Sequence, residues 1–213
     1  MNDILLIGGG GHCKSVIDTL ENADEFNIIG ILDQPEKIGS KVNGIEIIGI
    51  DEDLPSYFEQ GVQYAFITIG SVGNVSFRKS LYEYAKTIGY RFPTIIDKSA
   101  IISSNTELHE GCFIGKGAIL NTNVSIGINS IINTGTIIEH DCTIGEFCHI
   151  APGSTLSGSV QVGHHTHIGT NSTIIQNINI GHNSLIGAGS VVINNIENHK
   201  KAYGNPCKVV DSH

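Results

Sequence analysis

The chain has 213 residues, with 12 Lys or Arg against 21 Asp or Glu and a net charge of -9. That length allows one large domain or two small ones with a buried core, and the acidic balance argues against a nucleic-acid partner. No apolar run reaches membrane-spanning length, and we expect no secretory signal peptide and no membrane association. Five cysteines without a Cys-x-x-Cys pair argue against a disulfide framework. We expect a cytoplasmic, reduced protein.

The amino-terminal half alternates short apolar strands with helical segments. Strands are expected at 4–7, 26–33 and 64–70, a helix at 14–20, and a loop followed by a helix at 71–90. Alternating strands and helices predict a parallel sheet with its ligand at the carboxyl ends of the strands.

A run of four glycines, Gly8 to Gly11, forms the turn between the first strand and the first helix. Backbone amides at the start of that helix, around His12, are suited to holding phosphate. The dinucleotide fingerprint is imperfect, because Cys13 stands where Gly or Ala is usual. Too few residues precede the repeat described next for a complete NAD domain. A half-sized unit that holds a nucleotide sugar fits better, and a plain tight turn is the alternative for the glycines.

The second half repeats every six residues. Stepping by six through the sequence meets only aliphatic residues. These positions are Ile96, Ile102, Leu108, Ile114, Leu120, Ile126, Ile132, Ile138, Ile144, Ile150, Leu156, Val162, Ile168, Ile174, Ile180, Ile186 and Val192. Small residues occupy most positions two residues earlier, and glycine often follows the aliphatic residue.

A six-residue period is neither helical nor that of a long strand, and it suits short strands joined by tight turns, three to a coil. The aliphatic column fills the interior, the small column fits near a corner, and we expect the following glycine to ease the turn. This predicts a parallel β-helix of triangular section. The chain then divides into an α/β domain at 1–94 and a β-helix at 95–213 with a carboxyl-terminal cap.

The repeat resembles that of the hexapeptide-repeat acyltransferases, a resemblance that implies a left-handed β-helix. Cys112, Cys142 and Cys148 fall in the small column, so packing is favoured over metal or redox roles. The motif His164-His165-x-His167 looks metal-like, but its members occupy three different repeat positions. Solvated turn or subunit-contact residues are the favoured interpretation, and no metal site is expected.

A more specific resemblance covers nearly the whole chain. It is carried by the segments LLIGGGGH (5–12), ILD (31–33), TIGSVGNVSFR (68–78), IEHDCTIGEFCHIAPGS (138–154) and YGNPCK (203–208). These resemble the sugar acetyltransferases of the sialic-acid O-acetyltransferase (NeuD) type, which include the nucleotide-4-amino-sugar N-acetyltransferases of the bacillosamine pathway. The resemblance implies a homotrimer, acetyl-CoA as co-substrate, and active sites between neighbouring prisms.

The resemblance also assigns roles to individual residues. It implies that His140 is the general base with Asp141 as its carboxylate neighbour, and that His149 contacts the acetyl end of CoA. The residues that it places along the pantetheine arm are Gly158, Thr170 and Ala188. The residues that it places at the nucleotide sugar are Gly8, Gly9, Gly10, Gly11, His12, Asp33, Gly70 and, as a weaker candidate, Arg78. Cys13 and Gln34 depart from the family pattern and leave the sugar and its nucleotide open.

The spacing supports part of this assignment independently. One coil is three six-residue repeats, so Gly158 stacks directly above His140 and leaves room beside the imidazole. A histidine with an adjacent carboxylate is a plausible general base at neutral pH, although an exposed turn residue is the ordinary interpretation of a lone histidine. For Glu139 a structural or supporting role is favoured.

The predicted function is transfer of acetyl from acetyl-CoA to the 4-amino group of a nucleotide-linked amino-deoxy sugar, by direct attack. One alternative is O-acetylation of sialic acid or a related sugar hydroxyl. A second is a noncatalytic scaffold that binds sugar nucleotides. The sequence leaves open which nucleotide, which sugar and which glycan pathway are involved.

Overall fold

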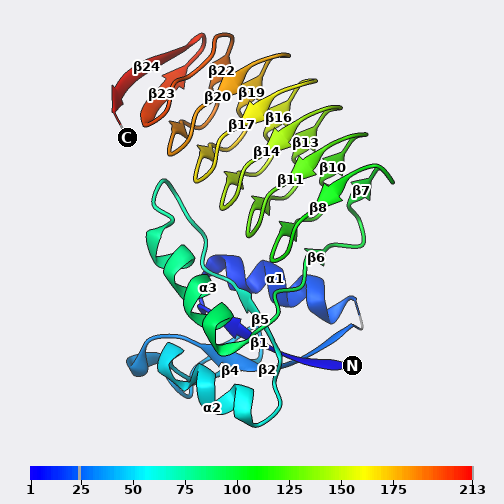
Figure 1. Cartoon of the computed structure of the whole chain (residues 1–213), viewed down its shortest axis with the longest axis vertical. Coiled ribbons are helices and arrows are strands. Elements are labelled where there is room, and N and C mark those ends of the chain that lie inside the picture. The colour runs from blue at the N-terminus through cyan, green and yellow to red at the C-terminus, as the bar shows by residue number, and fades with distance from the viewer. Residues whose placement is uncertain (24, 213) are drawn as a thin grey trace. The chain divides into compact units, whose positions relative to one another are not determined.

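The computed structural model describes residues 1–23 and 25–212 and divides the chain into two compact units (Figure 1). The first comprises Met1–Gly70 and Ser76–Ile95, and the second comprises Ser71–Val75 and the chain from Ile96 onward. The short segment 71–75 therefore packs with the second unit, although it lies within the sequence of the first. No helix in the described part of the chain is long and apolar enough to cross a membrane.

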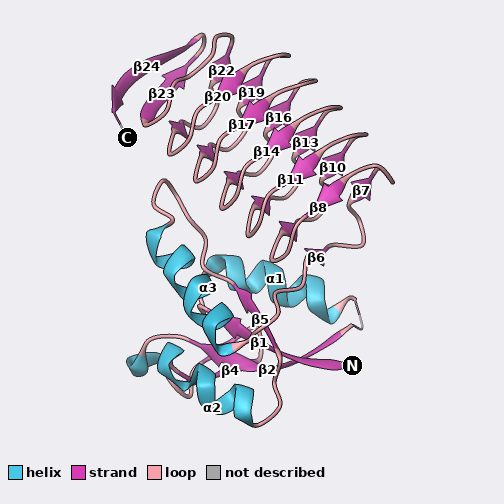
Figure 2. Cartoon of the chain, viewed as in Figure 1, coloured by secondary structure: helices cyan, strands magenta, loops and turns pink. Residues whose placement is uncertain are grey.

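The first unit is built on a five-stranded sheet in the order β3-β4-β2-β1-β5 (Figure 2). Its strands are β1 (Asn2–Ile7), β2 (Phe26–Leu32), β3 (Lys41–Val42), β4 (Ile45–Gly49) and β5 (Tyr64–Ile67). All neighbouring strands are parallel except β3, which pairs antiparallel with β4. The predicted strands exist: β1 ends at Ile7 as expected but begins two residues earlier, whereas β2 and β5 end earlier than expected, at Leu32 and Ile67. The short strands β3 and β4 were missed.

Helices of the first unit cover the apolar sheet. They are α1 (Gly11–Glu21), the 3-10 turns η1 (Pro35–Lys37) and η2 (Asp51–Asp53), α2 (Leu54–Glu59) and α3 (Ser76–Ile88). Leu5 and Ile7 of β1 join one buried cluster with Leu54 of α2 and Leu81 of α3. The helix α1 begins at Gly11, one turn before the predicted start, because Gly10 in extended conformation is its N-cap.

The strand order reverses at β1. The chain passes from β1 to β2 on one side and reaches β5 on the other. The carboxyl ends of β1 and β5 are therefore a topological switch point, where parallel α/β sheets bind ligands. Both strands end at this edge, after Ile7 and Ile67.

The second unit is a left-handed prism of three sheets, built from two-residue parallel strands except for β23 and β24, which are longer and pair antiparallel at the carboxyl end. One face contains β7 (Ile101–Ile102), β10 (Ile119–Leu120), β13 (Ile137–Ile138), β16 (Thr155–Leu156), β19 (Thr173–Ile174) and β22 (Val191–Val192). A second contains β8 (Glu107–Leu108), β11 (Ser125–Ile126), β14 (Thr143–Ile144), β17 (Gln161–Val162) and β20 (Asn179–Ile180). The third contains β6 (Ile95–Ile96), β9 (Phe113–Ile114), β12 (Ile131–Ile132), β15 (His149–Ile150), β18 (His167–Ile168), β21 (Leu185–Ile186), β23 (Lys200–Gly204) and β24 (Cys207–Ser212).

The aliphatic column fills the interior of the prism, as predicted. From Ile114 to Val192 every member is at most 3% exposed. The first coil is looser: Ile102 and Leu108 are partly buried against the core, and Ile96 is 40% exposed. In stacked coils each aliphatic residue of the column lies next to another, as in the pairing of Ile132 with Ile150. Burial of this column is the main source of stability in the unit.

The small column is buried and makes a second, polar ladder. Ser130 Oγ donates to Gly145 O (2.8 Å), and Ser154 Oγ donates to Gly169 O (2.9 Å). Cysteine thiols take the same place, with Cys142 Sγ 3.2 Å from Ser157 O and Cys148 Sγ 3.1 Å from Gly163 O. The predicted packing role of these cysteines is confirmed. The same contact explains why serine, threonine and cysteine can replace one another in this column, because each has one hydroxyl or thiol that donates to a carbonyl oxygen.

The corners of the prism use left-handed backbone at every sixth residue. This series has positive φ throughout: Gly111, Gly117, Asn123, Asn129, Gly135, Asp141, Phe147, Gly153, Ser159, His165, Asn171, Asn177, Asn183 and Gly189. Asn, Asp and Gly tolerate this conformation best, which accounts for much of the series.

The glycines that follow the aliphatic column have a different role from the predicted one. Gly127, Gly145, Gly163 and Gly181 do not have positive φ, so they do not ease a turn. A Cβ on Gly163 would lie 2.6 Å from the backbone nitrogen of His182 in the next coil. These glycines are required because neighbouring coils approach too closely there for any side chain.

This distinction predicts opposite responses to two glycine substitutions. Gly163→Ala should destabilise the prism by about 1–3 kcal/mol, because the added methyl group meets backbone that cannot move away. Gly189→Asn should be nearly neutral, since a Cβ there meets open space and asparagine already occupies the equivalent corner at Asn183. Denaturant unfolding of both variants measures the difference, and a stable Gly163→Ala beside an unstable Gly189→Asn would contradict the assignment.

Candidate active site

His140 and Asp141 form a hydrogen-bonded pair at the corner after β13. His140 Nδ1 lies 2.8 Å from Asp141 Oδ2, and both side chains are about half exposed. The hydrogen bond with His140, followed by one from Asn123, holds the pKa of Asp141 below its usual range. The carboxylate is therefore an acceptor, so the proton between the two residues is on Nδ1 of His140, and in the neutral imidazole the lone pair is on Nε2. This is the tautomer that a general base requires.

The next coil leaves space for the imidazole. A Cβ on Gly158 would lie 2.5 Å from His140 Cε1 and 2.6 Å from Nε2. The predicted stacking of Gly158 on His140 is confirmed. Glu139 accepts a hydrogen bond from Asn121 Nδ2 (2.8 Å), so its carboxylate is engaged within the prism wall.

A cavity of about 340 Å³ lies on another face of the prism. The sequence-predicted residues His149, Thr170 and Ala188 line it together. Gly158, which was expected with them, is not among its lining residues. Val72 and His167 also contribute to the wall and were not predicted, because only the fold brings the 71–75 segment and β18 to this place.

The base candidate and this cavity lie on different parts of one prism. His140 follows β13, in the sheet that runs from β7 to β22. The cavity is built on β15, β18 and β21, in the sheet that runs from β6 to β24. A single chain therefore does not show the predicted catalytic and CoA-contacting residues lining one common cavity.

The three histidines of the His-His-x-His motif point in different directions, as predicted, but one is not solvated. His164 is exposed and stacks on His182 with ring centroids 5.0 Å apart, and His165 contacts Phe147. His167 is only 8% exposed and meets His149 edge-on. The expectation of a solvated residue is wrong for His167, because its position in β18 places it in the cavity wall, and the subunit-contact alternative stays a prediction. Within the described residues, no three His, Cys, Asp or Glu side chains form a group that could hold a metal.

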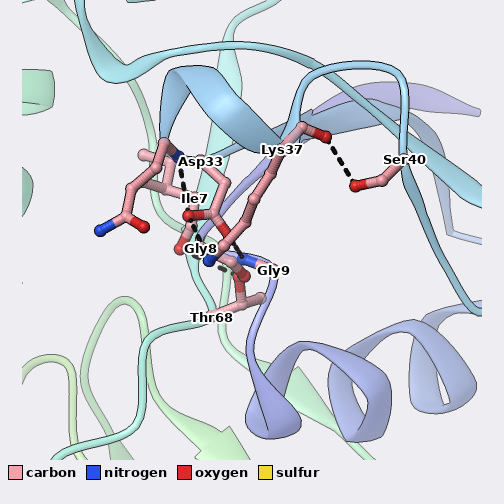
Figure 3. A network of polar contacts seen from close by, with 8 residues as sticks. Ile7, Gly8, Gly9, Asp33, Lys37, Ser40 and Thr68 are labelled. Atoms are coloured by element: carbon pink, nitrogen blue, oxygen red, sulfur yellow. Dashed lines mark hydrogen bonds and ion pairs between the residues drawn. The ribbon is translucent and has the colours of Figure 1, made fainter.

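The glycine loop of the first unit is tied to Asp33 (Figure 3). Gly9 N donates to Asp33 Oδ2 (2.7 Å), and Lys37 Nζ lies 3.0 Å from Oδ1. Burial alone would raise the pKa of Asp33, but hydrogen bonds from Gln34, Lys37 and Gly9 hold it below the usual range. Thr68 bridges β5 to the loop by donating to Ile7 O and Gly8 O. Asp33 is thus an ionised side chain that holds the glycine loop by a hydrogen bond, and we call it the Asp33 clamp.

A cavity of about 360 Å³ opens beside this clamp at the switch point of the sheet. Gly8 and Asp33 line it, together with Asp51 and Glu52 from η2. Burial, Glu52 and Asp33 together raise the pKa of Asp51. The η2 residues were missed because β4, which leads to them, was not predicted.

The other residues predicted to bind the nucleotide sugar do not line the cavity beside Asp33. A Cβ on Gly10 or Gly11 would meet open space, and one on Gly70 would touch His12 Cβ at 3.7 Å. Arg78, the weaker candidate, is 1% exposed and so meets protein atoms instead of solvent.

Comparison with known proteins identifies the parts of this architecture. Residues 3–85 match the PglD N-terminal domain, residues 123–158 match the bacterial transferase hexapeptide, and residues 159–193 match the hexapeptide repeat of succinyl-transferase. Among proteins with curated functions, none matches the sequence significantly.

Solved structures match over the full length. Perosamine N-acetyltransferase from Caulobacter crescentus, solved with CoA and GDP-perosamine as a variant with one histidine changed to asparagine, is 33% identical. The match covers 100% of this chain and 98% of that one, with a TM-score of 0.93. The acetyltransferase domain of PglB from Neisseria gonorrhoeae, solved with acetyl coenzyme A, is 28% identical over 99% and 100% of the two chains, with a TM-score of 0.91. WeeI from Acinetobacter baumannii shares the fold at 22% identity, 99% and 100% coverage and a TM-score of 0.84.

These matches define a hexapeptide-repeat transferase with a PglD-type amino-terminal domain. The chain belongs to the family of acetyl-CoA-dependent sugar N-acetyltransferases represented by perosamine N-acetyltransferase.

Proposed function

We propose that the protein transfers the acetyl group of acetyl-CoA to the 4-amino group of a nucleotide-linked amino-deoxy sugar. The observation that carries this proposal is the His140–Asp141 pair, whose 2.8 Å hydrogen bond leaves an imidazole lone pair at a half-exposed corner. Full-length similarity to an enzyme solved with CoA and GDP-perosamine supports the substrate class. Two complexes of that enzyme carry substitutions of one histidine, which supports a histidine-dependent reaction.

In the proposed mechanism, His140 Nε2 accepts a proton from the sugar amine as the nitrogen attacks the thioester carbonyl. The new C–N bond forms, the C–S bond breaks, and CoA leaves as the thiolate. Asp141 stabilises the imidazolium that forms on His140. An acyl-enzyme is disfavoured, because Cys142 and Cys148 are completely buried and burial raises the pKa of Cys142 to about 11.

The two cavities receive different parts of the substrates in this proposal. The cavity of His149, Thr170 and Ala188 holds the acetyl and pantetheine end of the donor. These three residues belong to an acetyltransferase domain at 95–213, and Val72 adds to the cavity wall from outside that range. The cavity beside Asp33 lies in a sugar-nucleotide domain at 1–94. Its carboxylates suit N–H and O–H donors of a nucleoside, while the amides of the α1 N-terminus at Gly10 and Gly11 suit phosphate.

We further propose a homotrimer in which one copy supplies the His140 corner and a neighbour supplies the acetyl-CoA cavity. Two features support it: the base candidate and the cavity lie on different parts of one prism, and the outward residues of one prism face are aliphatic except for Thr155 and Thr173. The outward residues of that face include Ile119, Ile137 and Val191, which are partly exposed, and Ile101, which is 64% exposed. Apolar faces of this kind favour association. A CoA-dependent reaction on a nucleotide sugar also agrees with a cytoplasmic location.

The acceptor class is tested by the release of CoA thiol from acetyl-CoA with a panel of acceptors. Nucleotide-linked 4-amino-4,6-dideoxy sugars should give turnover, with kcat/KM at least about 100-fold above that for sialic acid, since the site must recognise the nucleotide as well as the amine. Comparable rates with a sialic-acid hydroxyl would favour O-acetylation, and binding of sugar nucleotides without thiol release would favour a noncatalytic scaffold.

The general base is tested by His140→Ala. Its kcat should fall by about 10²–10⁴-fold, with unchanged melting, because a half-exposed corner side chain contributes little packing. His109→Ala is the matched control, since His109 is a similarly exposed histidine beside a carboxylate, Glu107. Asp141→Asn should cost less and shift the acidic limb of kcat/KM to lower pH, because the imidazolium loses its carboxylate neighbour. A His140→Ala enzyme that keeps more than about half of the wild-type kcat would place the base elsewhere.

A further inference from the structure

Both ring nitrogens of His149 are engaged by protein atoms. Nδ1 lies 2.7 Å from the backbone oxygen of Ser71, and Nε2 lies 3.2 Å from Nδ2 of Asn133. His149 is partly buried in β15 and lines the cavity with Thr170 and Ala188. It differs in this from His140, whose single hydrogen bond to Asp141 uses Nδ1 and leaves Nε2 available.

The donors and acceptors in this arrangement can be assigned. A carbonyl oxygen only accepts, so Nδ1 of His149 must carry a proton that it donates to Ser71. The amide of Asn133 is oriented by a second contact, because the backbone nitrogen of Thr134 donates to its Oδ1 (2.8 Å). The NH2 group of Asn133 therefore faces His149 and donates to Nε2. The arrangement fits a neutral imidazole with one proton, on Nδ1.

We propose that Asn133 and the Ser71 carbonyl are positioning groups that hold His149 as this neutral tautomer in the acetyl-CoA cavity. The inference rests on the proposed function, since it assigns that cavity to the donor. It has a mechanistic consequence: the lone pair of Nε2 is already used, so His149 shapes the acetyl site and does not act as a second general base.

The surroundings of His149 favour the neutral form. A proton on Nε2 would point at the NH2 group of Asn133, so that two donors would face each other. His167 is the titratable side chain that meets the imidazole, edge-on with centroids 4.9 Å apart, and it is itself buried. Two neighbouring imidazolium ions in a cavity wall would repel each other.

The Ser71 contact also builds part of the wall. Ser71 is 4% exposed, whereas the adjacent Val72 is 78% exposed and lines the cavity. The hydrogen bond from His149 thus fixes the segment that presents Val72. Through Nδ1, His149 holds the Ser71 segment of the cavity wall, and through Nε2 it is itself held by Asn133.

Asn133→Asp is the sharpest test, because it keeps the oxygen that accepts from Thr134 and replaces only the NH2 group by an acceptor. A carboxylate facing Nε2 favours a second proton on His149. At pH 7 the acetyl-CoA KM should rise by about 3- to 10-fold, with recovery as pH rises, while the acceptor KM changes less than about twofold. Asn179→Asp on the exposed face of β20 is the matched control for the added charge and should leave both KM values unchanged.

A spectroscopic measurement tests the tautomer without any substrate. In long-range 1H–15N spectra of histidine-labelled full-length protein, the signal that disappears in His149→Gln should show a protonated Nδ1 and an unprotonated Nε2. The same signal should become doubly protonated in Asn133→Asp. A wild-type His149 protonated on Nε2, or a His149 signal that Asn133→Asp does not alter, overturns the proposal. If the tautomer is found but the acetyl-CoA KM does not respond to Asn133→Asp, the positioning role in donor binding is overturned while the acetyl-transfer assignment stands on its own assay.

Discussion

Backbone hydrogen bonds between successive coils determine the position of every candidate residue in the prism. As far as Val192, each coil pairs with the next at a separation of 18 residues, as Ile132 pairs with Ile150 and Ile138 with Leu156. These bonds form only if the interior is filled, and the aliphatic column fills it. Because the repeat has no slip, a residue's number fixes its face, its corner and its neighbours above and below. Gly158 lies over His140 for this reason.

The same constraint explains which features could be predicted from the sequence. The prism, its buried column and the stacking of Gly158 on His140 follow from periodicity, which is a local and strictly repeated signal. The role of the glycines after the aliphatic column did not follow, since Gly163 is required by the backbone of another coil. The corner residues with positive φ also recur every six residues. Most are Asn, Asp or Gly, but larger residues such as Phe147 occupy some of these positions, so residue type alone did not reveal the series.

Sequence reasoning was weaker in the amino-terminal unit. The strands that lead to the glycine loop and to Asp33 were recognisable as apolar runs. The two-residue β3 and the η2 carboxylates carry no periodic signal. The η2 carboxylates reach the Asp33 cavity only because the sheet order places β4 beside β2. The engagement of His149 by Ser71 and Asn133 was equally hidden, because it joins segments far apart in the sequence.

The two site histidines illustrate how surroundings divide roles between identical side chains. His140 faces a carboxylate, which leaves its other nitrogen basic. His149 lies between a carbonyl and an amide, which use both nitrogens. In the proposed enzyme the first moves a proton and the second shapes the donor cavity, and the two come from neighbouring copies of the chain.

The most direct test of this account is activity in mixed trimers. His140→Ala removes the base, and Ala188→Trp fills the cavity at an exposed position; trimers of either variant alone should be nearly inactive. Differently tagged chains, coexpressed and purified as mixed trimers, should recover about a third of the wild-type activity, because one of three interfaces then joins an intact base to an intact cavity. Mixed trimers as inactive as both parents would contradict the account and place the base and the donor cavity within one copy.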